Sequence, residues 1–119
     1  MKKLAIAFLI MISVSVVSFA QTSTSPKVLK KFVVEREIPG AGKLSSVELQ
    51  GIASQSCITI DKMTEPVQWV QSYITDNKVY CVYLAENEEA IRTHAKLGGF
   101  PANKISEVKT IIDPTTAKK

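Results

Sequence analysis

Five side chains of this sequence carry groups that could bind a metal ion or move a proton. His94 is the only histidine, and its neutral imidazole can ligate a transition metal or act as a general base. Its plainer interpretation is a buried structural histidine with a hydrogen-bond partner. Glu35 is either a ligand or acid, or a charged residue on a solvent-facing edge. The remaining groups are the thiol of Cys81 and the hydroxyls of Tyr73 and Tyr83, which otherwise pack as ordinary strand residues.

The two cysteines leave a further alternative open. Cys57 and Cys81 do not have the spacing of a zinc knuckle or of a thioredoxin motif. A disulfide between them is a third interpretation, because Cys57 lies at the margin of a predicted helix and Cys81 on a strand that is expected to pass beneath it. Such a disulfide would remove Cys81 from the candidate metal ligands.

Motifs of the common enzyme classes are missing from the sequence. It contains no G-x-S-x-G, no P-loop, no G-x-G-x-x-G and no H-E-x-x-H pattern. This lowers the expectation of an enzyme without excluding one. We name no catalytic residue.

Residues 66–86 predict a β-hairpin that positions most of the candidate side chains. Two runs rich in Val, Ile, Tyr and Trp flank a tight turn at Asp76 and Asn77. Regular alternation places on one face Trp69, Gln71, Tyr73, Cys81 and Tyr83. It places on the other Val70, Ser72, Ile74, Tyr80, Val82 and Leu84. A β-bulge would overturn this assignment.

Capping residues predict one helix on each side of the hairpin. Ser45 and Glu48 form a capping box, so the first helix begins there and ends before Pro66. Asn87 caps the second helix, which is expected to run to Leu97. Its inner face joins Ile91, His94 and Ala95, and the glycines at positions 98 and 99 supply the C-cap.

Strands predicted at residues 29–38 and 103–113 complete the order β-α-β-β-α-β. This order is ferredoxin-like, an α+β fold with a four-stranded antiparallel sheet and both helices on one face. The uncovered face of such a sheet carries apolar side chains. We therefore expect a homodimer that covers it.

The orientation of the hairpin decides where the candidate groups lie. If the face with Cys81 and Tyr83 lies under the helices, these residues meet His94 and Glu35 in a semi-buried pocket. If it lies outward, they line the dimer interface. We favour the first arrangement, because an inward-facing His94 needs a polar partner and Glu35 or a tyrosine hydroxyl is available.

The N-terminus has the features of a secretory signal peptide. Lys2 and Lys3 precede an apolar run at residues 4–17, which is shorter than the roughly 20 residues of a membrane span. Cleavage is expected near Ala20 and would leave a periplasmic or secreted protein. The expected organisation is a signal peptide (1–20), a flexible spacer (21–28), one ferredoxin-like domain (29–114) and a disordered tail (115–119).

The net charge of the mature protein does not favour a nucleic-acid partner. Cleavage of the signal peptide removes Lys2 and Lys3 and lowers the net charge from +4 to +2.

Three sequence blocks resemble a known family: F-V-V-E-R-E-I-P-G-A-G-K-L (32–44), Q-W-V-Q-S-Y-I-T-D-N-K-V-Y-C-V-Y (68–83) and I-R-T-H-A-K-L-G-G-F-P-A-N (91–103). The chain is similar to small ferredoxin-like bacterial proteins that are catalogued as a domain of unknown function. The resemblance implies a dimeric α+β barrel and, from one member, nickel binding. The candidate ligands in these blocks are Glu35, Tyr73, Cys81, Tyr83 and His94. Many relatives carry His where Gln71 stands, a change that would weaken a nickel site.

Three functional hypotheses follow. The first is an exported, homodimeric protein that binds a divalent transition metal, most readily nickel, for buffering or sensing. The alternative is a small-molecule pocket between sheet and helices, with acid–base or oxygenase-type activity. A disulfide-stabilised interaction module is a third hypothesis.

Overall fold

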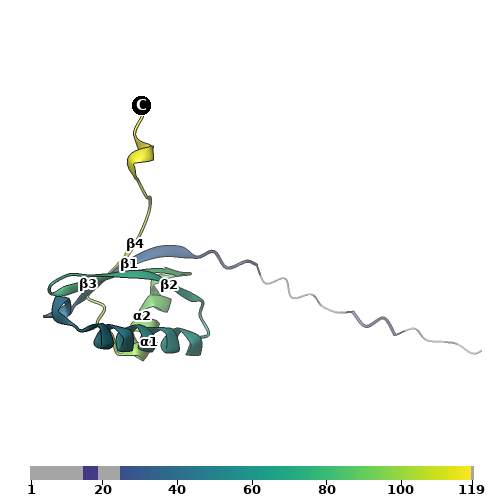
Figure 1. The fold of residues 1–119 in the computed structure, drawn as a ribbon. Helices are drawn as coiled ribbons and strands as arrows, with labels where there is room; N and C mark the ends of the chain where they lie inside the picture. The colour runs from purple at the N-terminus through teal and green to yellow at the C-terminus, as the bar shows by residue number, and fades with distance from the viewer. Residues whose placement is uncertain (1–14, 19–24, 119) are drawn as a thin grey trace, which may run out of the picture.

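The computed structural model describes residues 15–18 and 25–118, and most of the predicted signal peptide lies outside these ranges. The element order is the predicted one. Along the chain the strands and helices are β1 (Lys30–Glu37), α1 (Ser46–Lys62), β2 (Val67–Ile74), β3 (Lys78–Ala85), α2 (Glu88–Gly98) and β4 (Lys104–Glu107). Two short 3-10 helices, η1 (Ala41–Lys43) and η2 (Pro114–Thr116), follow β1 and β4. In Figure 1 both helices lie on the same side of the sheet, so the α+β fold is confirmed.

The four strands form one antiparallel sheet in the order β2-β3-β1-β4. In the register of β1 with β3, Val34 is opposite Cys81 and Glu35 is opposite Tyr80. Cys81 and Tyr83 therefore face the helices together with Phe32, Val34 and Arg36, all of which are buried. The predicted proximity of Glu35 to this pair is wrong, because the register places its side chain on the opposite face of the sheet.

A β-bulge in β2 overturns the predicted alternation of the hairpin. Trp69 is opposite Tyr83 and Gln71 is opposite Val82, so Val70 is an extra residue in the strand. Beyond the bulge, Ser72 is opposite Cys81 and Ile74 is opposite Val79, while the neighbours of Ser72 point to the other face. The open face of the sheet, on the side away from the helices, therefore receives Gln71 and Tyr73. It also carries Glu35, Tyr80, Val33 and Val82.

Both predicted helix starts are confirmed. The hydroxyl of Ser45 accepts a hydrogen bond from the backbone N–H of Glu48, and the Glu48 carboxylate accepts one from the N–H of Ser45. Asn87 caps α2 through its side-chain oxygen. At the other end of α2, Gly99 is the C-cap with a φ of 72°, in the left-handed region that glycine tolerates.

The last strand is much shorter than the predicted 103–113. It ends at Glu107, opposite Phe32, and the N–H of Val108 makes a final backbone hydrogen bond to the carbonyl of Lys31. The partner strand β1 begins at Lys30, so it is too short to pair with a strand that reaches residue 113. The chain then leaves the sheet on the side away from the helices (Figure 1). Asp113, the last residue of the predicted strand, instead caps η2, which extends into the predicted tail at residues 115–119.

The core is asymmetric between the two helices. In α2, Ile91, His94 and Ala95 are buried against the sheet, as predicted. In α1 only Ser56 and Thr59 are buried, while the apolar residues of its inner stripe are half-buried or exposed. The apolar stripe of α1 is therefore incompletely packed, and a cavity lies between this helix and the sheet.

Candidate functional site: a cavity that contains a buried arginine

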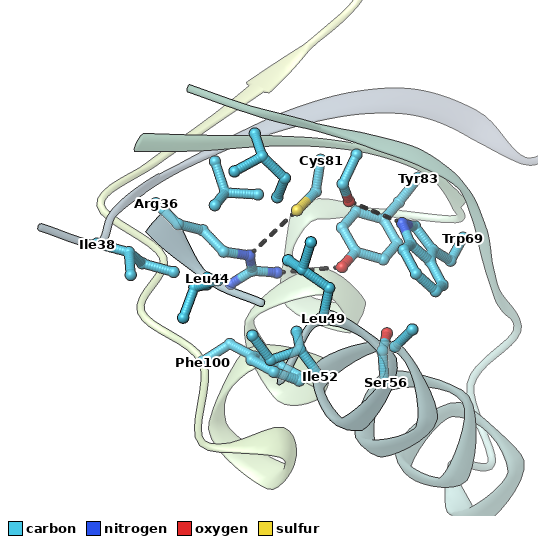
Figure 2. Close-up of a pocket in the computed structure, with 14 residues that line it drawn as sticks. Arg36, Ile38, Leu44, Leu49, Ile52, Ser56, Trp69, Cys81, Tyr83 and Phe100 are labelled. Carbon is cyan, nitrogen blue, oxygen red and sulfur yellow. Dashed lines mark hydrogen bonds between the residues drawn. The ribbon is translucent and has the colours of Figure 1, made fainter. Parts of the chain in front are cut away.

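The cavity between α1 and the inner face of the sheet has a volume of about 230 Å³. Its walls come from β1, β2 and β3 on one side and from α1 on the other, with Phe100 after α2 (Figure 2). The lining is largely apolar: Ile38, Leu44, Leu49, Ile52, Ala53, Trp69, Ile74, Val79 and Phe100. Its polar members are Arg36, Ser56, Ser72, Cys81 and Tyr83. Concave, mostly apolar sites with a few polar groups are the usual form of small-molecule sites.

Arg36 is the charged residue of this cavity and is only 3% exposed. Its Nε donates to the sulfur of Cys81 at 3.4 Å and one terminal nitrogen donates to the hydroxyl of Tyr83 at 3.2 Å (Figure 2). The other terminal nitrogen donates to the backbone carbonyl of Pro101. The guanidinium carbon also lies 5.3 Å from the centre of the Phe100 ring. None of these partners is a carboxylate, so they orient the charge without forming an ion pair with an acidic side chain.

No carboxylate forms an ion pair with Arg36 in the described part of the chain. The nearest acidic residues in sequence, Glu35 and Glu37, belong to the alternate positions of β1, on the other face of the sheet. Because a guanidinium stays protonated in proteins, Arg36 is a buried positive charge without a carboxylate counter-ion among residues 15–18 and 25–118.

His94 lies behind the cavity wall and is fully buried. Its Nε2 is 3.1 Å from the hydroxyl of Ser56, and its ring stacks with Phe100 at a centroid distance of 5.6 Å. Burial, and secondarily the charge of Arg36, lowers the pKa of His94 to about 4, whereas the contact with Ser56 acts in the opposite direction. His94 is therefore a neutral imidazole at neutral pH, and its Nδ1 is buried and has no hydrogen-bond partner among the residues that the structure describes.

Tyr83 connects the arginine with the histidine. Its hydroxyl accepts the hydrogen bond from Arg36, and its ring centre is 5.1 Å from that of His94. Burial raises the pKa of Tyr83 to about 12; proximity to Cys81 also raises it, whereas Arg36 lowers it. The phenol therefore stays protonated at neutral pH and is not an anionic partner for the arginine.

The five predicted metal ligands divide between the two faces of the sheet. Cys81, Tyr83 and His94 lie on the inner face, as the favoured arrangement required. Glu35 and Tyr73 lie on the open face, where Glu35 pairs with Lys78 at 3.4 Å. The polar partner of His94 is Ser56 rather than the predicted Glu35 or a tyrosine hydroxyl.

The inner-face residues do not fit a metal ion. The Cys81 sulfur and the Tyr83 hydroxyl both accept hydrogen bonds from the Arg36 guanidinium, whose charge repels a cation. Within residues 15–18 and 25–118, no three His, Cys, Asp or Glu side chains are grouped as a metal site. One chain alone therefore does not bring together a nickel shell from these residues.

The two cysteines are free in the structure. Cys57 is exposed on α1, whereas Cys81 is buried in the sheet. The structure therefore does not contain the disulfide between Cys57 and Cys81 that the sequence left open, because Cys57 points outward from α1 and not toward β3.

Sequence reasoning missed Arg36 as a functional candidate. The pattern did contain the information, since Phe32, Val34 and Arg36 alternate on one face of the first strand. Two consecutive apolar positions on a face that packs against helices predict that the third is buried as well. A charged side chain at such a position is rare without a partner and marks a site.

Comparison with known proteins gives the family. A solved structure with the same fold is that of SCO4226 from Streptomyces coelicolor A3(2), with 22% identity, a TM-score of 0.56, and coverage of 69% of this chain and 99% of that chain. Among curated proteins no relative matches the sequence. The family model for nickel responsive proteins like SCO4226 matches residues 32–108, which is more than half of the chain. The chain belongs to the SCO4226-like nickel responsive protein family.

Proposed function

We propose that this protein is an exported homodimer that binds nickel, or a related divalent transition metal, for buffering or sensing. Its membership of the nickel responsive family carries the proposal. The apolar run at residues 4–17 supports export. In the described residues no helix has both the length and the apolar character to span a membrane.

The metal site of this proposal lies on the open face of the sheet, between two copies of the chain. The inner face is unsuitable because of Arg36. On the open face, Glu35, Tyr80 and Tyr73 occupy one row across β1, β3 and β2. Tyr73 also accepts a hydrogen bond from the amide nitrogen of Gln71. A two-fold copy of this face would double its carboxylates, Glu35 and Glu37, and its phenols, which one chain does not supply in sufficient number.

Calorimetric titration with nickel, zinc and copper at neutral pH tests this function. We expect saturable nickel binding that Glu35→Gln weakens by roughly tenfold or more, because the substitution removes the carboxylate in the row with Tyr80 and Tyr73 from each copy. His94→Ala should leave nickel affinity unchanged, since His94 lies on the other side of the sheet. Glu89→Gln on the exposed surface of α2 is the control for the loss of one negative charge.

Two results would contradict the proposal. If none of the three metals binds, the hypothesis that this protein by itself binds a transition metal is rejected. Nickel binding that is lost in His94→Ala and kept in Glu35→Gln would move the site to the inner face and would require Arg36 to leave Cys81 and Tyr83.

A further inference from the structure

The buried guanidinium of Arg36 at the cavity wall is the feature of this molecule that indicates a bound ligand. Arg36 is 3% exposed and its charge is not cancelled by any described carboxylate. Isolated buried charges are strongly unfavourable, and folded proteins pair them. Its environment therefore favours an anion.

The guanidinium has hydrogen-bonding capacity left for that anion. Its hydrogen bonds to Cys81, Tyr83 and Pro101 use one N–H on each of its three nitrogens. A guanidinium carries five N–H groups, so each terminal nitrogen keeps one donor that has no partner in the described part of the chain. A carboxylate is the anion whose two oxygens match such a pair of donors.

The rest of the cavity favours an apolar body on the same ligand. Leu49 and Ile52 of α1 line the cavity together with the aromatic side chains of Trp69 and Phe100 (Figure 2). A volume of about 230 Å³ admits a small molecule only, since drug-sized ligands occupy pockets of roughly 300 Å³ and more. The lining residues Ile52 and Ile74 are 42% and 41% exposed, which gives the cavity a route to solvent.

We propose that this cavity binds a small organic carboxylate, with its carboxylate group on Arg36 and its aromatic or short aliphatic body between α1 and the sheet. This site is independent of the metal site proposed above, which lies on the opposite face. A phosphate or sulfate ion would satisfy the charge but would leave the apolar walls in contact with water. An uncharged apolar molecule would fill the walls but would leave the arginine unpaired.

The fluorescence of Trp69 provides a direct measurement, because it is the only tryptophan of the chain and lines the cavity. The protein, purified in the form that accumulates in its host cell, is titrated with phenylacetate and, separately, with phenylacetamide. Phenylacetamide has nearly the same shape but no charge. We expect saturable changes with phenylacetate and at least tenfold weaker binding of the amide. Hexanoate, an aliphatic carboxylate of similar size, should compete with phenylacetate.

Two arginine variants test the role of the charge. Arg36→Gln should weaken phenylacetate binding by at least tenfold and abolish the preference over the amide. Arg92→Gln is the matched control, because Arg92 is the other arginine of the chain and is exposed on α2, where it pairs with Glu88. Its phenylacetate affinity should equal that of the wild type.

A third variant keeps the test decisive if Arg36→Gln does not fold. Ala53→Leu adds apolar volume from α1 into the cavity without removing any contact of Arg36, and leucine is well tolerated in helices. It should remain folded and lose phenylacetate binding. Equal affinities for phenylacetate and phenylacetamide, no saturable response to either carboxylate, or full binding by a folded Ala53→Leu variant would each overturn the proposal.

Discussion

Arg36 shows how one residue can set the chemistry of a whole face. A strand that packs against helices normally presents only apolar side chains to them, and here the third inward position of β1 is a cation. Its neighbours are the sulfur of Cys81, the carbonyl of Pro101, the hydroxyl and ring of Tyr83 and the ring of Phe100, all of which interact favourably with a guanidinium. The same charge disfavours protonation of His94 and binding of a metal ion nearby.

His94 should make the stability of this protein depend on pH between pH 8 and pH 5. Its pKa is about 4 in the folded protein and near 6.5 when unfolded, so lowering the pH through this window adds a proton to the unfolded chain first. The stabilisation is therefore complete above about pH 6.5 and is lost as the pH falls toward 4. Urea unfolding should show a loss of about 2 kcal/mol between pH 8 and pH 5.

His94→Gln is the control for this pH effect. It removes the only histidine, while carboxyl groups of ordinary pKa titrate mostly below this window. The free energy of unfolding of the variant should therefore change little between pH 8 and pH 5. An equally steep loss in His94→Gln would show that another group is responsible.

At the scale of elements, the sequence correctly predicted the features that depend on neighbouring residues in the chain, such as the starts of the helices. The caps Ser45 and Asn87 fix where the helices begin, and each acts within three residues of the chain. The bulge at Val70 and the facing of Glu35 were not predictable in this way. They depend on how β2 and β1 register against β3, and a shift of one residue reverses the facing of a strand. The length of the last strand, predicted to reach residue 113, was also overestimated. The length of a strand ladder depends on the partner strand, which the local sequence does not reveal.

The two helices offer a matched pair of glycine substitutions. A Cβ at Gly98 in α2 would lie 2.4 Å from the ring of Phe100, whereas a Cβ at Gly51 in α1 would meet nothing within 4 Å. Gly98→Ala should destabilise the protein by about 1–3 kcal/mol, because Phe100 must leave its stack on His94. Gly51→Ala should stabilise it by up to ~1 kcal/mol, since alanine is the better helix former.

Thermal and urea unfolding of both glycine variants measure this difference. Stabilisation by Gly98→Ala would mean that Phe100 moves aside freely, in which case the ring would not be a fixed wall of the cavity. A destabilising Gly51→Ala would mean that α1 is in contact with another part of the protein at that position.

At the scale of the molecule, the open face of the sheet is what a second copy would cover. Val70 and Tyr73 are 49% and 55% exposed, and Val33, Val82 and Leu84 on the same face are half-buried. Sedimentation should show a dimer at micromolar concentration. Val33→Lys should shift it toward the monomer, because two-fold symmetry would place two new charges in one apolar interface.

Ile58→Lys is the control for the added charge, since Ile58 is 49% exposed on α1. It should leave the sedimentation coefficient of the dimer unchanged. A wild-type protein that sediments as a monomer would contradict the predicted assembly and, with it, the two-copy metal site.

The extra residue in β2 has a consequence for how this chain is compared with its relatives. Val70 is absorbed by the bulge, and residues on either side of it keep regular partners in β3. A relative that lacks this one residue would present equivalent residues to the helices and to the open face as this chain does. An alignment gap at position 70 is therefore structurally silent, whereas a gap displaced by a single column would match inward-facing residues with outward-facing ones and assign their chemistry to the wrong side of the sheet.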